Sequence, residues 1–319
     1  MKILIIRFSS IGDILLTFPV LEGLRRKYPD AEIHILTKAS FAGLFQLHPS
    51  NFKVIAFDQS LFGMASQLKK ENYHMVIDLH NNLRTFLLQC FMLHFYWKRF
   101  HKLNLRKWLL TTFNYNVLPT IHITERYAKA ADVIPVYPLI LKVPDGISPF
   151  ELPNQYVAWV LGATFQTKQF PIEKLKETIE KVEHPIVLLG GEQEIPLAQQ
   201  ILASFPACIS LAGQTSIIEA AAILQSSKGV VTNDTGLMHL AAFFNKPMVC
   251  IWGNTVPSFG MYPYQCDHVY YSEVENLSCR PCSKIGYNAC PKGHFNCMMK
   301  QDSNKIAAQV NGWFYSGSQ

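Results

Sequence analysis

The sequence of 319 residues lacks the features that mark membrane-spanning and secreted proteins. No stretch reaches the roughly 18 uninterrupted apolar residues that a transmembrane helix needs. The nearest one, TFLLQCFMLHFYW at 85–97, is shorter and contains Gln89 and His94. The N-terminal sequence MKILIIRFSS has no apolar segment followed by a small-residue cleavage site, which is the mark of a signal peptide. We therefore expect a cytoplasmic protein, and the length predicts about two domains.

Charge is scarce and unevenly placed. Charged residues make up 16% of the chain and apolar residues 49%, as is typical of a globular protein. Residues 1–150 hold 18 Lys and Arg against 10 Asp and Glu, whereas residues 151–319 hold 11 against 13. A basic first half indicates an anionic partner, such as phosphorylated lipid or an anionic membrane face, or else only a solvated surface. No nucleic-acid-binding module accompanies this charge, so we expect no nucleic-acid partner.

The chain also has no internal repeat, no low-complexity segment and no G-x-G-x-x-G fingerprint, which disfavours a dehydrogenase. Short β-branched runs alternate instead with amphipathic helical patterns, the first of them a helix over 13–27. This alternation predicts βαβ units around parallel sheets. The proline-rich segment 137–155 interrupts it. We therefore expect an α/β protein of two doubly wound, Rossmann-like domains, residues 1–148 and 149–319, with ligand bound in a cleft at the carboxyl ends of the strands.

Two strand–turn–helix junctions carry polar residues. In RFSSIGDILLT (7–17) a strand is followed by small residues and then Asp13. Small residues let backbone amides face an anion, and Asp13 at this place suits a general base, or else only caps the helix. In VVTNDTGLMHLAA (230–242) another strand ends in a carboxylate, a hydroxyl and a glycine.

Four segments resemble the lipopolysaccharide heptosyltransferases, which are glycosyltransferases of family 9 with the GT-B fold. They are FSSIGDILLTFPVLEGLRRKYPDAEIHILTK (8–38), YHMVIDLHNNLRT (73–85), HITERY (122–127) and TNDTGLMHLAAFFNKPMVCIWGNT (232–255). The resemblance implies transfer of a heptose from ADP-heptose to the inner core or lipid A acceptor of lipopolysaccharide in a Gram-negative cell. The configuration is inverted, Asp13 is the general base, and no metal or other cofactor is required. The alternatives are another nucleotide sugar or acceptor, or a non-catalytic nucleotide-sugar-binding protein.

On the donor side, the resemblance implies that Lys168 neutralises the nucleotide phosphates and that the helix following Thr235 receives the diphosphate. Asp234 then either caps this helix or accepts a hydrogen bond from a sugar hydroxyl. Glu194 resembles the residue that binds the ribose, although Glu192 is close enough to be confused with it. The expected donor-binding residues are Thr164, Lys168, Glu194, Asp234, Thr235, Gly236 and His239, with Lys168 also catalytic.

On the acceptor side, Arg84 matches a family arginine, and a cluster of cations that begins at Lys98 follows it. An acidic lipid A–core acceptor and peripheral contact with the cytoplasmic face of the inner membrane fit this charge. The apolar segment 86–97 either rests on the membrane or, as we favour, forms a buried core helix. The expected acceptor-binding residues are Ser9, Ser10, Gly12, Arg84 and Lys98.

Seven of the eight cysteines form two groups. Cys90, Cys208 and Cys250 lie in apolar sequence and are expected to be buried thiols. The others of interest follow the pattern C-x2-C-x7-C-x6-C, with a histidine inside the segment. Such spacing suits a structural zinc ion, unmetallated thiols or a disulfide, and these alternatives stay open. The residues concerned are Cys279, Cys282, Cys290 and Cys297.

Overall fold

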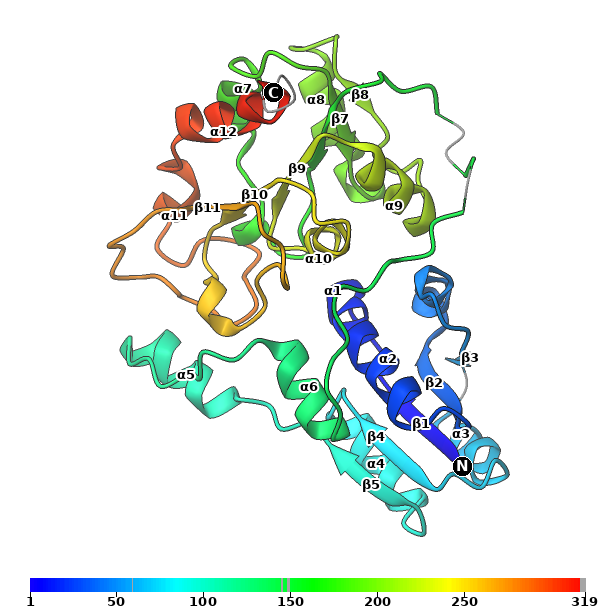
Figure 1. Cartoon of the computed structure of the whole chain (residues 1–319). Helices are drawn as coiled ribbons and strands as arrows, with labels where there is room; N and C mark the ends of the chain where they lie inside the picture. The colour runs from blue at the N-terminus through cyan, green and yellow to red at the C-terminus, as the bar shows by residue number, and fades with distance from the viewer. Residues whose placement is uncertain (59, 145, 148–149, 316–319) are drawn as a thin grey trace. The chain divides into compact units, whose positions relative to one another are not determined.

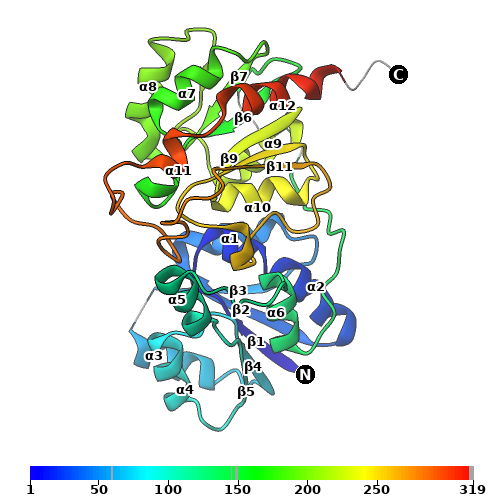
Figure 2. The same cartoon turned by 90° about the vertical axis from the view of Figure 1, so that its left-hand side faces the viewer.

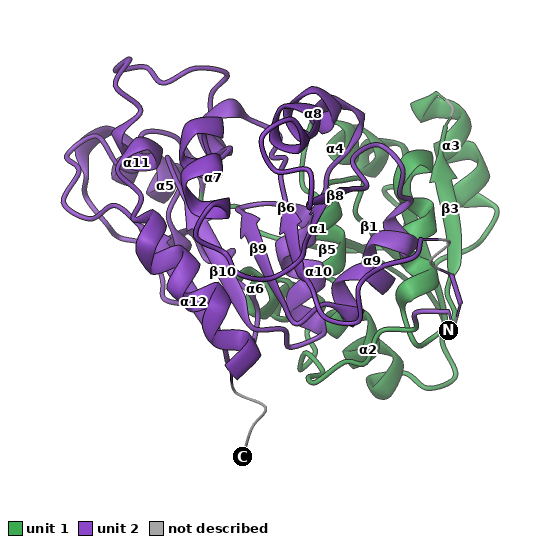
Figure 3. Cartoon of the chain, turned by 90° about the horizontal axis from the view of Figure 1, so that it is seen from above, with its two compact units in different colours: residues 1–103, 121–142 green, residues 104–120, 143–319 purple. Residues whose placement is uncertain are grey.

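The computed structural model describes residues 1–58, 60–144, 146–147 and 150–315 (Figure 1). They form two compact units, coloured separately in Figure 3. Unit 1 comprises Met1–Leu103 and Ile121–Lys142, and unit 2 comprises Asn104–Thr120 and Val143–Gln319. The boundary expected at 148/149 falls outside the described residues. Residues 104–120, which the sequence places in the first domain, group with unit 2 instead.

Unit 1 is built on a parallel sheet of order β3-β2-β1-β4-β5. Figure 2 shows two helices, α2 and α6, on one face of this sheet and α3 and α4 on the other. The strands are β1 (Lys2–Ile6), β2 (Glu32–Lys38), β3 (Lys53–Phe57), β4 (Met75–Asp78) and β5 (Tyr96–Arg99). The helices are α1 (Ile11–Leu15), α2 (Phe18–Lys27), α3 (Leu61–Lys69), α4 (Leu83–Phe91) and α6 (Ile123–Ala131), with the 3-10 segment η1 (Ala39–Leu47).

The helix predicted over 13–27 is two helices. α1 ends at Leu15 and α2 begins at Phe18, with Pro19 in its first turn. A proline ring clashes with the carbonyl four residues earlier, here that of Leu15, so a continuous helix through Pro19 is disfavoured. The break leaves α1 as a short segment directly after β1, and this positions Asp13 at the carboxyl edge of the sheet.

Segment 133–136 crosses α2 at Gly23. A Cβ at Gly23 would lie 2.3 Å from the carbonyl oxygen of Ile134, and the Val136 N–H donates to Pro19 O at 2.9 Å. Gly23→Ala gains about 1 kcal/mol of helix propensity but forces backbone apart, at a cost of about 1–3 kcal/mol. We expect a net loss of stability in thermal unfolding. Gly43→Ala, whose Cβ has nothing within 4 Å, is the matched control; equal melting temperatures for the two variants would contradict the close approach.

Unit 2 is built on a second parallel sheet, of order β11-β10-β9-β6-β7-β8. Helices α7, α8 and α12 cover one face, and α9 and α10 cover the other (Figure 2). The strands are β6 (Val157–Val160), β7 (Ile186–Leu189), β8 (Ile209–Ser210), β9 (Gly229–Asn233), β10 (Met248–Trp252) and β11 (Val269–Glu273). The helices are α5 (Asn104–Phe113), α7 (Ile172–Ile179), α8 (Ile195–Leu202), α9 (Ile217–Ser226), α10 (Gly236–Phe243), α11 (Asn296–Met299) and α12 (Ser303–Tyr315), with 3-10 segments η2 (Gln166–Lys168), η3 (Glu192–Glu194) and η4 (Pro257–Phe259).

The apolar segment 86–97 departs from its prediction. It is not one buried helix: α4 ends at Phe91, and Tyr96 and Trp97 belong to β5. One side of α4 is exposed, and with it Cys90, which we expected to be buried; Cys208 and Cys250 are buried as expected. Among the described residues, no helix is both long enough and apolar enough to cross a bilayer.

Candidate active site

The first cluster of polar groups lies at the carboxyl edge of the unit 1 sheet, where α1 begins. Ser10 takes the N-cap position in an extended conformation, so Asp13 is the third residue of the helix rather than its cap. The Asp13 carboxylate reaches back to Ser10, accepting from its Oγ at 3.1 Å and its N–H at 3.4 Å. This arrangement resembles a capping box and fixes the direction of the carboxylate.

Arg7 pairs with Asp13 and holds it in place. The Arg7 Nη2 and Asp13 Oδ2 atoms are 2.7 Å apart, and the Arg7 side chain is only 8% exposed. Arg7 is itself anchored, because its Nε donates to Ser9 O at 2.8 Å and its Nη1 to Leu79 O at 2.6 Å. The hydroxyl of Tyr127, on α6, donates to Asp13 Oδ1 at 3.1 Å. Sequence reasoning missed both Arg7 and Tyr127, although Arg7 directly precedes the motif.

These contacts set the charge state of Asp13. Burial alone would raise the pKa of this carboxyl group, since it disfavours the charged form. The positive charge of Arg7 and the hydrogen bonds from Ser10 and Tyr127 outweigh burial, and the pKa of Asp13 is lowered from its ordinary value. Asp13 is therefore an ionised carboxylate at neutral pH, 20% exposed and thus accessible to a ligand.

β4 brings a second charged pair to the same edge, because Asp78 lies opposite Ile6 in the sheet register. Asp78 is fully buried and accepts from Arg99 Nε and Nη2 at 3.1 and 3.0 Å. It also accepts the backbone N–H groups of His80 and Asn81. Burial, Arg7 and Lys102 lower the pKa of the His80 imidazole to about 4, so it is neutral at neutral pH.

The remaining acceptor-side candidates are placed differently from one another. Ser9, Ser10 and Gly12 form the turn and first residues around Asp13. The Arg84 guanidinium lies over the rings of Phe8 and Phe57, at 5.8 and 5.4 Å, and so adjoins the end of β1. Lys98 instead faces the C-terminal end of α6, where its Nζ is 3.5 Å from Asp132. The described contacts do not bring Lys98 to Asp13.

A second cluster lies at the carboxyl edge of the unit 2 sheet, between β9 and α10. Thr235 is the N-cap of α10 and makes no side-chain capping bond. Asp234 does not cap the helix, so that alternative was wrong: it pairs with Lys168 at 2.5 Å and accepts from Thr255 Oγ1 at 2.8 Å. The Lys168 and Asp234 side chains are 16% and 13% exposed. The structure thus brings the predicted lysine to the predicted helix start, with Gly236 as its first residue.

Glu194 lies at the carboxyl ends of the neighbouring strands β6 and β7. Its Oε2 accepts from the Gly191 N–H at 2.8 Å, and a Cβ at Gly162 would lie 2.5 Å from its carboxyl carbon. Gly162 thus leaves room for the carboxylate in its present position. Glu194 is half-buried, whereas Glu192 is exposed, which favours Glu194 as the residue that faces the strand ends. Thr164 lies in the loop after β6 and is exposed.

Two further residues of unit 2 lie near this edge of the sheet. His239, on the first turn of α10, is only 3% exposed. Asn254, which follows β10, was missed by sequence reasoning. It is 1% exposed, yet neither its Nδ2 nor its Oδ1 has a hydrogen-bond partner in the described part of the chain. Buried amides are normally hydrogen-bonded. The side-chain amide of Asn254, next to Thr255, could therefore bind a ligand or a water molecule.

The cysteine segment does not form a closed metal site. None of the chain's eight cysteines is in a disulfide, and Cys279 Sγ lies 3.9 Å from His294 Nε2. Among the described residues, the only group that brings three ligand atoms within 4.8 Å of one another is Glu32, His34 and Glu71 in unit 1. The thiols as placed therefore do not fit the tetrahedral geometry of structural zinc. Cys279 and Cys282 instead line a cavity of about 500 Å³ beside α5.

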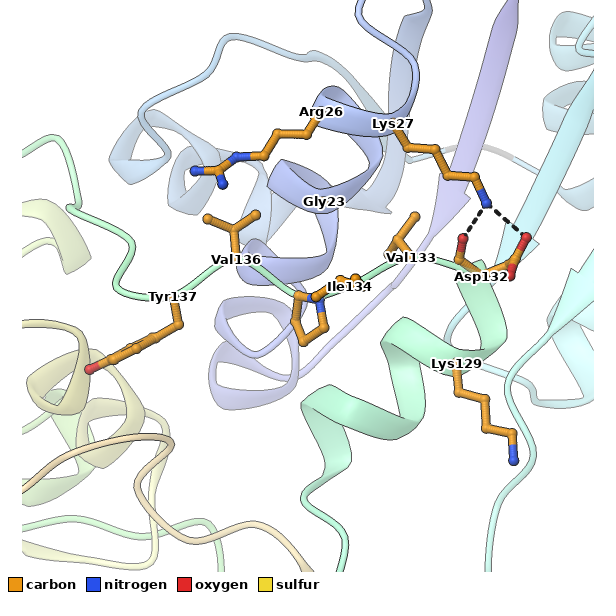
Figure 4. Close-up of a pocket in the computed structure, with 10 residues that line it drawn as sticks. Gly23, Arg26, Lys27, Lys129, Asp132, Val133, Ile134, Val136 and Tyr137 are labelled. Atoms are coloured by element: carbon orange, nitrogen blue, oxygen red, sulfur yellow. Dashed lines mark hydrogen bonds and ion pairs between the residues drawn. The ribbon is translucent and has the colours of Figure 1, made fainter.

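A larger cavity, about 800 Å³, lies in unit 1 beside the C-terminal ends of α2 and α6. Its polar groups do not converge. Lys27 donates a hydrogen bond to Asp132, while the side chains of Arg26 and Lys129 point away from this pair (Figure 4). α2 runs back from the carboxyl edge of the sheet, so this cavity lies away from Asp13. Size alone therefore does not make it the candidate active site.

Comparison with known proteins assigns the family. The chain matches the profile of glycosyltransferase family 9 (heptosyltransferase) over residues 62–290. It is similar to lipooligosaccharide heptosyltransferase 2 of Haemophilus influenzae, with 27% identity over 297 residues that cover 81% of this chain and 85% of the relative. Its fold resembles that of ADP-heptose lps heptosyltransferase II of E. coli, with a TM-score of 0.78 and 21% identity over 100% of both chains. It also resembles E. coli heptosyltransferase WaaC solved with ADP, with a TM-score of 0.67 and 19% identity over 98% and 100% of the chains. The chain therefore belongs to glycosyltransferase family 9 and is a glycosyltransferase of the GT-B fold.

Proposed function

We propose that this enzyme transfers a heptose from an ADP-activated donor to the inner core or lipid A part of lipopolysaccharide, with inversion of configuration. Similarity to a lipooligosaccharide heptosyltransferase supports the sugar and the class of acceptor, and the structural relative WaaC, solved with ADP, supports the nucleotide. The observation that carries the proposal is the ionised, partly exposed Asp13, held in place by Arg7, Ser10 and Tyr127.

In the proposed reaction, a hydroxyl oxygen of the acceptor forms a bond to the anomeric carbon of the heptose. The bond between that carbon and the diphosphate oxygen breaks, and the hydroxyl proton moves to the carboxylate of Asp13. A positioned carboxylate suits this general-base role. Its lowered pKa keeps it unprotonated, and attack on the face opposite the leaving group inverts the anomeric centre.

The leaving ADP acquires negative charge, which unit 2 is suited to stabilise. The N-terminus of α10 presents backbone N–H groups and a positive helix dipole, and the Thr235 hydroxyl is not used as a cap. Lys168 adds a full positive charge at this position, and a diphosphate would compete with Asp234 for it. The proposal assigns charge stabilisation to these protein groups and requires no metal cofactor.

The acceptor is acidic and anchored in lipid, which suits the basic composition of residues 1–150. We place the enzyme at the cytoplasmic face of the inner membrane as a peripheral protein. Arg84, beside the end of β1, is the cation best placed to meet an acceptor phosphate.

Turnover tests the proposal. Purified enzyme is offered ADP-heptose together with a panel of truncated lipid A–core acceptors, and ADP release is followed. Release that depends on one acceptor supports the proposal and identifies the step. Donor binding without turnover on any acceptor would contradict the assignment of heptose or lipopolysaccharide. Absence of donor binding would contradict the assigned role of Lys168 and α10.

The Arg7–Asp13 pair predicts a pH effect. Because Arg7 lowers the pKa of Asp13, activity falls on the acid side only where pH drops through that lowered pKa. Arg7→Met removes the positive charge but leaves the burial, so the pKa of Asp13 rises and the acid limb of the kcat/KM profile moves to higher pH. Arg7→Lys retains the charge and is expected to keep the limb close to that of the native enzyme. An unmoved acid limb in Arg7→Met would show that Asp13 does not govern the profile.

A further inference from the structure

The outward side of α4 is apolar and exposed. Its residues recur at helical spacing, and we call them the outer face of α4: Leu83, Phe86, Leu87, Cys90 and Phe91. Leu83 is 73% exposed and Phe86 49%. The opposite side of the helix is also apolar, because Leu88 is fully buried against the unit 1 core. A helix with large apolar residues on two opposite sides normally has both sides covered, so the outer face of α4 lacks its cover.

Neighbouring residues extend this surface. Phe62, at the start of α3, is 72% exposed, and its ring centroid lies 6.0 Å from that of Phe91. Leu93, just after α4, is 74% exposed. Two helices of unit 1 therefore contribute large side chains to one continuous apolar area, and such areas mark docking sites for membranes or proteins.

The chain segment that carries α4 is basic, and Arg84 is the cation on α4 itself. Residues 79–103 contain four Lys and Arg and no Asp or Glu. One of the four, Arg99, lies over the Phe86 ring at 5.9 Å but is paired with Asp78, and Lys98 is paired with Asp132. Another, Arg84, projects from the first turn of α4 itself and is exposed. Aromatic and leucine side chains flanked by cations are the composition of segments that lie in the interface of anionic bilayers.

α4 lies near the edge of the sheet that carries Asp13. Its N-terminal end adjoins the carboxyl edge of the sheet, because Arg84 lies over Phe8. Asp13 follows five residues after Phe8 at the same edge. A lipid surface against α4 would hold lipid-anchored molecules close to the edge that carries Asp13.

We propose that the outer face of α4, together with Phe62 and Leu93, docks on an anionic lipid bilayer and so presents unit 1 to a membrane-anchored acceptor. The reference to the acceptor rests on the proposed function; the docking itself does not. A second copy of the chain is a poorer occupant, because a two-fold contact through this surface would bring like charges together. An anionic bilayer complements both the apolar side chains and the cations.

Flotation with vesicles tests the docking. We expect the native enzyme to float with phosphatidylcholine vesicles that contain phosphatidylglycerol, and less so with phosphatidylcholine alone or at high salt. Leu87→Gln/Phe91→Gln and Phe62→Gln/Leu93→Gln should each weaken binding by about tenfold or more. The second pair is the more exposed and thus the less able to disturb folding. The control is Ile134→Gln/Ile140→Gln, 85% and 81% exposed in the same unit, which should bind as the native enzyme does.

Three outcomes would overturn the docking: no flotation of the native enzyme, equal flotation of the α4 variants and the control, or self-association that the α4 substitutions abolish without affecting flotation. Turnover on a deacylated, water-soluble core acceptor separates the two proposals. The α4 variants should retain this turnover and lose it only when the acceptor is embedded in vesicles. If the native enzyme floats but turns over no soluble acceptor, the proposed function fails while the docking stands.

Discussion

Asp13→Asn is expected to lower kcat by about 10³-fold, within the range that a positioned general base contributes. The amide keeps the size of the carboxylate but cannot accept the acceptor proton. Donor affinity should not change, because the residues that we propose for donor binding lie in unit 2. Steady-state ADP release gives kcat, and titration with ADP-heptose gives the affinity.

The control for this prediction is Asp30→Asn, an exposed carboxylate in the turn before β2. It should leave kcat as it is in the native enzyme. Since Asp13→Asn leaves the buried Arg7 without its counter-charge, thermal unfolding must show that the variant is still folded at the assay temperature. A folded Asp13→Asn enzyme with more than a tenth of the native kcat would exclude Asp13 as the base.

Lys168→Gln is expected to lower kcat by about 10²-fold and to raise the KM for the donor. In the proposed mechanism the lysine charge acts on the diphosphate, whose negative charge grows as the bond to the sugar breaks, and removing one such group typically costs 10²–10³-fold. The loss in kcat is the informative part, because a lysine that only bound the ground state would change KM alone.

Lys174→Gln provides a matched control. Lys174 is also in unit 2, is 13% exposed and pairs with Glu177 at 2.6 Å, much as Lys168 pairs with Asp234. It lies on α7. Equal kinetic effects of the two substitutions would mean that Lys168 is only a structural ion-pair partner.

Much of the fold could be predicted from periodicity. The alternation of β-branched runs with amphipathic stretches predicts most of the strands, since both faces of a parallel sheet are buried and its strands read as apolar runs. The short edge strands β5 and β11 were missed, because edge strands are only half covered and their sequences, such as YWKR, are not apolar runs. The division of the first long helix was available in principle from Pro19.

The candidate site was predictable only where a motif carried it. Asp13, Lys168 and Asp234 stand in recognisable segments, and in the structure Lys168 pairs with Asp234. Arg7 could not be assigned, because its partners include Leu79 O, which is 72 residues away in sequence and directly follows the neighbouring strand β4. The sequence of α4 likewise could not be interpreted without the structure. A helix with apolar residues on two opposite sides gives little indication of which side the sheet covers, and the buried helix that we favoured was wrong.

The most direct test of the central claim is the stereochemistry of the product. Enzyme, ADP-heptose and a deacylated lipid A–core acceptor are mixed, and NMR of the isolated product reports the new glycosidic linkage and its anomeric configuration. The account predicts a single heptosyl linkage, inverted relative to the donor and absent when Asp13→Asn replaces the native enzyme. A product with retained configuration, or equal product from the variant, would contradict it.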